Sequence, residues 1–129
     1  MEAERLRVVV AGPGTGDGAR AVVALARALR VAGAEVVHTG GGGSPAQLAA
    51  TLVQEDADAL GLAGSSGALL AEVLGRAADQ GADDVAGFLI GAVGSEADGA
   101  DLPESARAFP PGAAPDDVVG WLRTVGAGS

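Results

Sequence analysis

Cysteine is absent from the 129-residue sequence, and histidine occurs once, at His38. The lack of cysteine excludes disulfides, iron–sulfur clusters and thiolate zinc sites, because each of these requires cysteine sulfur. A single histidine cannot form the histidine cluster on which many other metal sites depend. We therefore predict no metal site built from the side chains of this chain alone.

Aromatic residues make up only 2% of the chain, so the core must be built from valine, leucine, isoleucine and alanine. Small aliphatic side chains suit a parallel β-sheet that is covered by helices on both faces. The hydrophobic fraction of 48% and the charged fraction of 19% are typical of a globular protein rather than of a disordered chain. The length is sufficient for one domain that folds without covalent or metal cross-links.

Basic residues are also few: eight of them stand against 17 acidic residues, which gives a net charge of −9. This balance disfavours nucleic acid and anionic membranes as partners, because binding to either depends on Lys and Arg neutralising phosphate groups. No apolar run is long enough to span a bilayer, and residues 1–5 do not resemble a signal peptide. We therefore expect a cytoplasmic protein.

Short apolar runs alternate with segments of helical periodicity along the chain. Predicted strands lie at Leu6–Ala11, Ala34–Thr39, Ala57–Leu62, Val85–Gly91 and Ala106–Phe109. Predicted helices run from about Ala19 to Ala32, from Pro45 past Val53, from Gly67 to about Gln80 and from Pro115 to about Val125. Gly33 is the expected C-cap of the first helix, and Ser44 and Ser66 are the expected N-caps of the second and third. The polar segment Ser95–Glu104 is predicted to be a loop or at most a short helix.

This alternation predicts parallel β-α-β units with right-handed crossovers in one α/β domain. Five strands fit the flavodoxin-like, doubly wound order 2-1-3-4-5 better than the longer dinucleotide-binding fold. The two most apolar runs are expected inside the sheet, with Leu6–Ala11 at its centre and Val85–Gly91 also interior. We expect a single domain over residues 1–129, ordered from about residue 5 to 125. A ligand would bind beyond the carboxyl ends of the strands.

The loop after the first predicted strand contains the pattern Gly-x-Gly-x-x-Ala twice, starting at Gly14 and at Gly16. Glycines allow backbone amides to approach a phosphate, and the N-terminus of a helix favours negative charge. Asp17, however, would repel a phosphate and would itself cap the helix. A flexible turn with an acidic cap is the favoured interpretation, and a phosphate cradle is the alternative.

The remaining loops contain no catalytic constellation. The segment Gly40–Gly43 is interpreted as a connector rather than as a loop that wraps a ligand. No His or Cys lies near Ser65 in the sequence to activate it as a nucleophile. The acidic pairs Asp83-Asp84 and Asp116-Asp117 are interpreted as solvated caps at the edge of the sheet away from the ligand. The residues alone thus predict a ligand-binding fold without catalytic groups.

The order of short segments gives a more specific indication. Along the chain come Arg7-Val-Val-Val-Ala-Gly-Pro-Gly14, Ala26-Arg-Ala-Leu-Arg30, Ala32-Gly-Ala-Glu-Val-Val37, Thr39-Gly40, Ser44-Pro45, Gln54-Glu-Asp-Ala-Asp-Ala-Leu-Gly-Leu62, Ser66-Gly-Ala68, Gly81-Ala-Asp-Asp84, Phe109-Pro-Pro-Gly112 and Asp117-Val-Val119. In this order and spacing they resemble the cobalamin-binding domain, or small subunit, of methylmalonyl-CoA mutase and its relatives. The resemblance extends from about Arg5 to Val125.

The resembling family carries Asp-x-His-x-x-Gly in its first loop, where the His binds cobalt and the Asp fixes the imidazole tautomer. Aligned without gaps, the Asp, His and Gly positions fall on Gly16, Gly18 and Ala21, so this motif is degenerate. The cofactor-binding residues implied by the resemblance are Gly14, Thr15, Gly16, Asp17, Gly18, Ala63, Ser65, Ser66, Gly67, Gly91, Ala92, Gly112 and Ala113. None of them is a metal ligand.

The resemblance therefore implies a domain that binds a cobalamin without a histidine ligand of its own, as part of an adenosylcobalamin-dependent acyl-CoA mutase-like enzyme. A cobalamin-free interaction or assembly module and a small nucleotide-binding domain remain open as alternatives. None of these is catalytic alone, because the cofactor carries the radical chemistry and the substrate would bind to another chain.

The expected partner is a larger catalytic subunit or another protein. It would face Gly12–Gly18, Gly40–Gly43, Ala63–Gly67 and the loop after Gly91, because these loops are poor in charge and a desolvated contact surface disfavours unpaired charge.

Overall fold

The computed structural model describes residues 6–12, 16–39, 44–64, 66–91, 102, 106–110 and 112–127. Strands and helices alternate along them in the order β1 (Arg7–Ala11), α1 (Gly16–Val31), β2 (Glu35–His38), α2 (Pro45–Gln54), β3 (Ala59–Ala63), α3 (Gly67–Asp79), β4 (Ala86–Ile90), β5 (Ala106–Phe109) and α4 (Pro115–Ala127). Every predicted strand and helix is present. All of the predicted loop Ser95–Glu104 except Leu102 lies outside the described residues.

The largest difference from the sequence prediction is the start of α1, which begins at Gly16 rather than at Ala19. The first turn of this helix contains two glycines and Asp17, so it has no apolar residue whose spacing could reveal it. Asp17 lies in the first turn, where its negative charge favours the helix N-terminus, and it pairs with Arg20 at 3.0 Å.

The five strands form one sheet in the order β2-β1-β3-β4-β5, and every neighbouring pair is parallel. This confirms the predicted flavodoxin-like topology. Both β1 and β4 are interior, as predicted, but the middle position belongs to β3 and not to β1. The prediction placed β1 at the centre because β1 is more hydrophobic than β3. The central strand β3 (Ala-Leu-Gly-Leu-Ala) is nevertheless fully buried, although it contains small residues and no valine.

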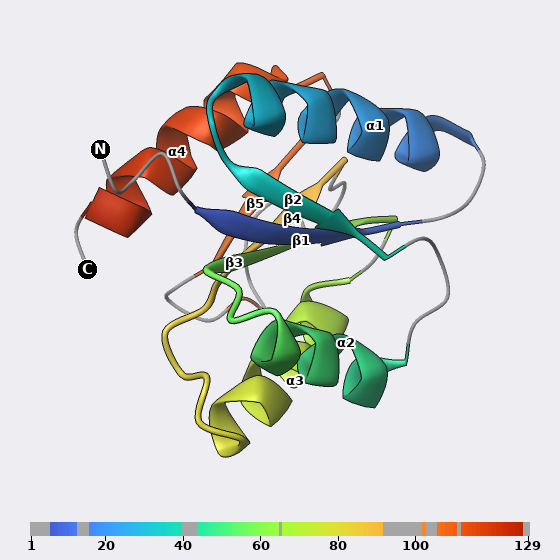
Figure 1. Ribbon diagram of the computed structural model, residues 1–129. Coiled ribbons are helices and arrows are strands. Elements are labelled where there is room, and N and C mark those ends of the chain that lie inside the picture. Colours follow the sequence, from blue (N-terminus) through green and yellow to red (C-terminus); the bar gives the residue numbers. More distant parts are fainter. Residues whose placement is uncertain are drawn as a thin grey trace.

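The helices form a layer on each face of the sheet, with α1 and α4 on one side and α2 and α3 on the other (Figure 1). Successive residues of β1 point to opposite layers, as the period of a strand requires. Val8 and Val10 belong to the core beneath α1 and α4, whereas Val9 and Ala11 belong to the core beneath α2 and α3. The sheet is therefore buried from both sides.

The helix ends follow the predicted capping chemistry. The Ser44 hydroxyl accepts a hydrogen bond from the backbone N–H of Gln47 at 3.1 Å, and the Gln47 side-chain oxygen accepts one from the backbone N–H of Ser44 at 3.0 Å, which completes a capping box. Ser66 caps α3 by accepting from the N–H of Leu69 at 3.1 Å. Gly33 ends α1 in the left-handed conformation (φ +98°).

The few aromatic residues lie together on the α1 and α4 side of the core. Phe88, Phe109 and Trp121 pack edge to face, with ring centroids 5.9–6.4 Å apart. Phe88 is fully buried, and its ring lies against the backbone of Gly61 on the neighbouring strand, in the space that a Cβ at that glycine would need. The absence of a side chain at position 61 therefore makes room for the ring of Phe88, the largest of the fully buried side chains.

We predict that Gly61→Ala lowers the free energy of unfolding by about 1–3 kcal/mol, because the new methyl group overlaps the Phe88 ring. The matched control is Gly75→Ala, in α3, where an added Cβ meets nothing within 4 Å. This control should raise the stability by about 0.5–1 kcal/mol through helix propensity. Urea unfolding of both variants checks the pair, and equal midpoints for Gly61→Ala and the parent would contradict the prediction.

Candidate functional site

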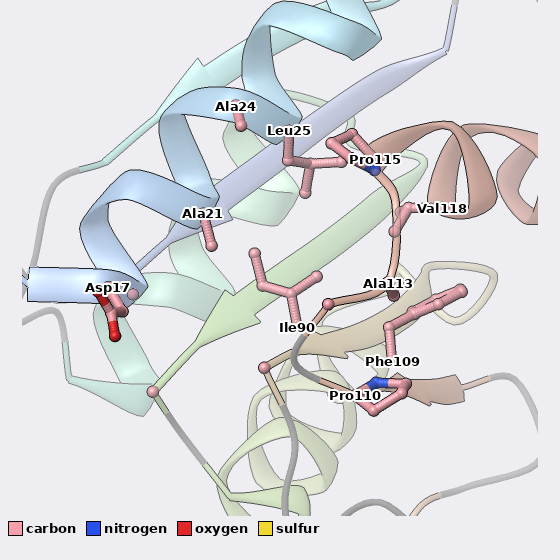
Figure 2. Close-up of a pocket in the computed structure, with 14 residues that line it drawn as sticks. Asp17, Ala21, Ala24, Leu25, Ile90, Phe109, Pro110, Ala113, Pro115 and Val118 are labelled. Carbon is pink, nitrogen blue, oxygen red and sulfur yellow. The ribbon is translucent and has the colours of Figure 1, made fainter.

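A cavity of about 540 Å³ opens at the carboxyl edge of the sheet, between α1 and the start of α4. It is bounded by the first turns of α1, the ends of β4 and β5, and the segment that leads into α4 (Figure 2). The residues that line it are Asp17, Gly18, Ala21, Ala24, Leu25, Gly64, Ile90, Gly91, Phe109, Pro110, Gly112, Ala113, Pro115 and Val118.

The wall of this cavity is apolar. Leu25, Ile90 and Val118 are buried, and Figure 2 shows their side chains with those of Ala21 and Ala113 around the open space. Among the described lining residues, Asp17 alone is charged, and its side chain is almost fully exposed at the mouth. Such a lining suits a flat apolar group that enters from the solvent and is held mainly by packing.

Small residues on α1 create the space. Gly18, Ala21 and Leu25 follow one another at helical spacing and face the cavity, so two of the three positions carry little or no side chain. Close beneath them, a Cβ on Gly12 would come within 2.9 Å of Val22 and 3.1 Å of Ala63. The helix is thus packed tightly against the ends of β1 and β3, while its neighbouring face leaves a hollow.

Two turns of the rim depend on glycine for their backbone conformation. Gly91, directly after β4, has a φ of +73°, and Gly112, before α4, has a φ of +92°. A Cβ at either position would meet nothing within 4 Å, so space is not the constraint. The constraint is the left-handed backbone conformation, which L-residues with a side chain disfavour.

The structure divides the cofactor-binding residues predicted from the family resemblance into three groups. Asp17, Gly18, Gly91, Gly112 and Ala113 line the cavity. Gly16 begins α1, Ala63 is buried at the end of β3, and Ser66 and Gly67 form the start of α3, so these four lie near the edge without lining it. Gly14, Thr15, Ser65 and Ala92 lie outside the described residues.

Sequence reasoning missed most of the wall. Ala21 was considered only as a position of the degenerate motif. The predicted cofactor-binding residues did not include Ala24, Leu25, Gly64, Ile90, Phe109, Pro110, Pro115 and Val118. For α1 a signal was available, since Gly18, Ala21 and Leu25 share one helical stripe. Between β5 and α4 the resembling segment Phe109-Pro-Pro-Gly112 indicated Gly112 and Ala113 alone, and only the crossover from β4 to β5 brings the neighbouring residues opposite α1.

One assignment from the sequence is wrong. Asp116 and Asp117 were placed at the edge of the sheet away from the ligand, but they begin α4, which starts just beyond the carboxyl end of β5. A helix that follows a parallel strand necessarily starts at that edge. The predicted role as a cap agrees with the structure for Asp117, whose carboxylate accepts from the backbone N–H of Ala114 at 3.3 Å.

A well-connected charged cluster lies at the opposite, amino edge. Arg7 at the start of β1 donates to the Glu35 carboxylate at 2.8 Å and to the backbone carbonyl of Glu55 at 2.7 Å, and its own N–H donates to Asp58 at 2.8 Å. The hydrogen bond to Glu35 and the charge of that carboxylate raise the pKa of Arg7 above its ordinary value. Arg7 therefore ties β1, β2 and the segment before β3 together far from the cavity.

Within the part of the chain that the structure describes, no three His, Cys, Asp or Glu side chains are grouped so as to hold a metal ion. His38 is exposed at the end of β2 and does not line the cavity. The described helices include none that is long and apolar enough to cross a membrane. The cavity can therefore bind and orient a group, but its described residues offer no nucleophile or metal ligand.

The rim turns lead to a prediction at Gly91. Replacement by Ala should lower the free energy of unfolding by about 1–2 kcal/mol, because the turn must keep its left-handed backbone. Replacement by Asn should cost less, since Asn tolerates this conformation better than other side-chain-bearing residues. Urea unfolding distinguishes strain from crowding: if the larger Asn costs more than Ala, space and not conformation limits this position.

No family model matches the chain. Over 70 residues the sequence is 39% identical to the 2-hydroxyisobutanoyl-CoA mutase small subunit of Aquincola tertiaricarbonis. This match covers 54% of the present chain and 52% of the relative, so it spans about half the length of each.

Among solved structures, a cobalamin-binding protein from Desulfitobacterium hafniense DCB-2 matches with a TM-score of 0.69 and 16% identity. The match covers 95% of this chain and 59% of that one. A fragment from Peptoclostridium difficile 630 that is named a lipoprotein matches with a TM-score of 0.51 and 15% identity, over 96% of this chain and 98% of the fragment. At these identities the two structures establish the fold alone. In sequence the chain thus resembles a mutase small subunit over about half its length, and in fold it resembles a cobalamin-binding protein; both agree with the resemblance predicted from the order of its sequence segments.

Proposed function

We propose that this domain binds a cobalamin and that the cavity between α1 and α4 receives the nucleotide tail of the cofactor. The observation that carries the proposal is the cavity itself: an apolar hollow at the carboxyl edge of the sheet, in a chain that resembles cobalamin-binding domains. Ligands of doubly wound folds bind at this edge. The volume of about 540 Å³ lies within the range of small-molecule sites.

The residues present fit such a tail. Its base is flat and largely apolar, and it would pack against Leu25, Ile90 and Val118. The phosphate and sugar would remain nearer the solvent, at the glycine turns, where exposed backbone lets polar groups approach. Asp17 lies at this mouth, and Arg20 offsets part of its charge at 3.0 Å. The wall would orient the cofactor, and the rim would admit its polar parts.

This placement also bears on the lower face of cobalt. Gly18, the position of the family's histidine, lines the cavity and has no side chain that could reach the metal. A cobalamin whose base lies in the cavity cannot keep that base on cobalt. We therefore infer that, with its base in the cavity, the cofactor would be bound in the base-off form and would receive no imidazole from this chain.

We further propose that the domain is the cofactor-binding part of a mutase-like enzyme whose larger subunit holds the substrate. The name of the relative from Aquincola tertiaricarbonis supports this role. When bound, the cofactor would supply the radical chemistry, and this chain would bind it, orient it and shield its tail from water. The described lining residues contribute packing groups and backbone, which suits those tasks.

The direct test is the absorbance spectrum of the protein after incubation with hydroxocobalamin and gel filtration. We expect a corrinoid band that co-elutes with the protein and has the base-off form. Ala21→Phe should fill the cavity and weaken binding by about tenfold or more. The control Ala46→Phe places the same ring on the exposed surface of α2, on the other side of the sheet, and should bind normally.

Three other results would carry a different meaning. A colourless protein fraction would favour a cobalamin-free assembly module. A base-on spectrum would place the nucleotide tail outside the cavity. Equal binding by both phenylalanine variants would separate cofactor binding from this cavity.

The degenerate motif provides a second test. Gly18→His combined with Gly16→Asp should shift the spectrum of the bound cofactor toward a histidine-ligated form, because these are the family's ligand and orienting positions. Gly16 has a φ of +85° and open space around its Cβ position, and Asp is among the residues that tolerate this backbone best. A histidine-ligated spectrum in the unmodified protein would contradict the inference about the lower face. Gly18→Gln is the control for side-chain bulk without an imidazole.

A further inference from the structure

The outward face of α1 is unusually apolar for a surface of this chain. Val23 and Val31 are 57% and 84% exposed, and between them lie the small residues Ala24 and Ala28. Together with Ala19, Arg20, Arg27 and, from α4, Asp116, these residues line a groove of about 630 Å³. We call this set of eight residues the α1 groove.

The folding of the domain does not require the α1 groove. Val22, Leu25, Ala26 and Leu29 on the opposite side of the helix already bury its apolar stripe against the sheet. Arg20, Ala24, Arg27 and Val31 recur at helical spacing on the outer side, away from the sheet that Figure 1 shows beneath α1. A second apolar stripe on an already packed helix is typical of a contact surface rather than of a core element.

The charges around the α1 groove give the second observation. The chain has 17 acidic and eight basic residues, and Arg7, Arg20 and Arg76 each pair with a carboxylate. Arg27 and Arg30, both on the outer side of α1, form no ion pair with any residue that the structure describes. In a chain of net charge −9, these two cations flank the exposed valines, while Asp116 of α4 is the one carboxylate that lines the groove.

We propose that the α1 groove docks an acidic amphipathic helix of a partner protein. Its aliphatic side chains would contact Val23 and Val31, and its carboxylates would pair with Arg27 and Arg30. Ala24 and Ala28 leave a shallow channel between larger neighbours. When two helices pack, a ridge of side chains on one helix fits into such a channel on the other. An acidic partner is repelled by most of this chain, so the complementary charge at the α1 groove would also set its orientation.

A second copy of this chain fits the groove less well. A symmetric contact through α1 would place each residue against its own counterpart or a near neighbour, so Arg27 and Arg30 would face like charges. Such a contact costs free energy unless an anion lies between the arginines, whereas the carboxylates of a Glu-rich helix would neutralise the charges of both arginines. The proposal requires no cofactor, and Ala24 alone lines both the α1 groove and the cofactor cavity.

The probe is a fluorescently labelled amphipathic peptide of about 16 residues, as long as α1, with Leu on one face and Glu on the other. A counterpart carries Lys in place of every Glu. Fluorescence anisotropy with the cofactor-free chain should show that the Glu peptide binds and that the Lys peptide binds at least about tenfold more weakly. Binding of the Glu peptide should weaken as salt is added. Backbone amide shifts in NMR spectra should map its site to residues 20–31.

Variants separate the apolar contribution from the charge. Val23→Ser with Val31→Ser should reduce binding of the Glu peptide by about tenfold or more, since both valines lose their apolar contact. Val53→Ser is the matched control, because Val53 is also an exposed valine but lies on α2 across the sheet. Arg27→Glu with Arg30→Glu should reverse the preference toward the Lys peptide, while Arg76→Glu on α3 should leave it unchanged.

Several outcomes would overturn the proposal. These are equal binding of the two peptides, amide shifts outside α1, or an effect of Val53→Ser as large as that of the double serine variant. Sedimentation with phosphatidylserine vesicles without peptide binding would assign the groove to an anionic membrane instead. A concentration-dependent dimer that is lost in the double serine variant would assign it to a second copy. Every measurement uses the cofactor-free protein, so these outcomes would not contradict the cobalamin proposal. Likewise, failure to bind a corrinoid would not contradict docking at the α1 groove.

Discussion

Burial of the sheet on both faces is the constraint on which the rest of the structure depends. Strands β3 and β4 are buried along their whole length, so each of their residues must fit beneath a helix layer. With only 2% aromatic residues, the chain meets this requirement mainly with alanine, valine, leucine and glycine. In such a close-packed core a single added atom causes a steric clash. Gly61 is an example, because only the absence of its Cβ leaves space for the Phe88 ring.

The same use of small residues produces the cavity. Where α1 lies over β1 and β3, Gly12 allows contact so close that an added methyl group would collide with Val22. A short distance along the same helix, Gly18 and Ala21 leave space that no described side chain fills. The glycine turns after β4 and before α4 form part of the rim. A site formed in this way has shape and an apolar wall but little chemistry of its own, which fits a domain that holds a reactive cofactor rather than one that reacts.

Charge is distributed unevenly around this framework. The amino edge carries a network in which Arg7 joins Glu35, Glu55 and Asp58, and this network stabilises the edge of the sheet opposite the cavity. The described wall of the cavity has Asp17 as its single charge. The outer side of α1 carries exposed valines beside Arg27 and Arg30, which form no ion pair with any described residue. Three surfaces of one small domain thus differ in what they can contact: a charged structural edge, an apolar mouth and a basic, apolar helix face.

The sequence by itself determined the elements and their order. Alternating apolar runs, Ser44, Ser66 and Gly33 at helix ends, and the right-handed crossover rule were sufficient for the topology, because each acts over a few residues or one β-α-β unit. The centre of the sheet was misjudged, since burial of β3 depends on neighbours on both sides and not on its own hydrophobicity. The order of segments also indicated the family, and the replaced ligand positions at Gly16 and Gly18 can be seen without coordinates.

Only the tertiary structure decided which residues share the cavity. Leu25, Ile90 and Val118 are far apart in the sequence, and nothing in their local patterns distinguishes them from other core residues. They meet because α1 crosses over the sheet and α4 returns beside it. The same return brings Asp116 and Asp117 to the carboxyl edge, where local reasoning had not placed them. The exposure of the valines on the outer side of α1 likewise could not be predicted from the sequence. Whether a helix exposes or buries a valine depends on what packs against that side, and the sheet of this chain covers only one side of α1.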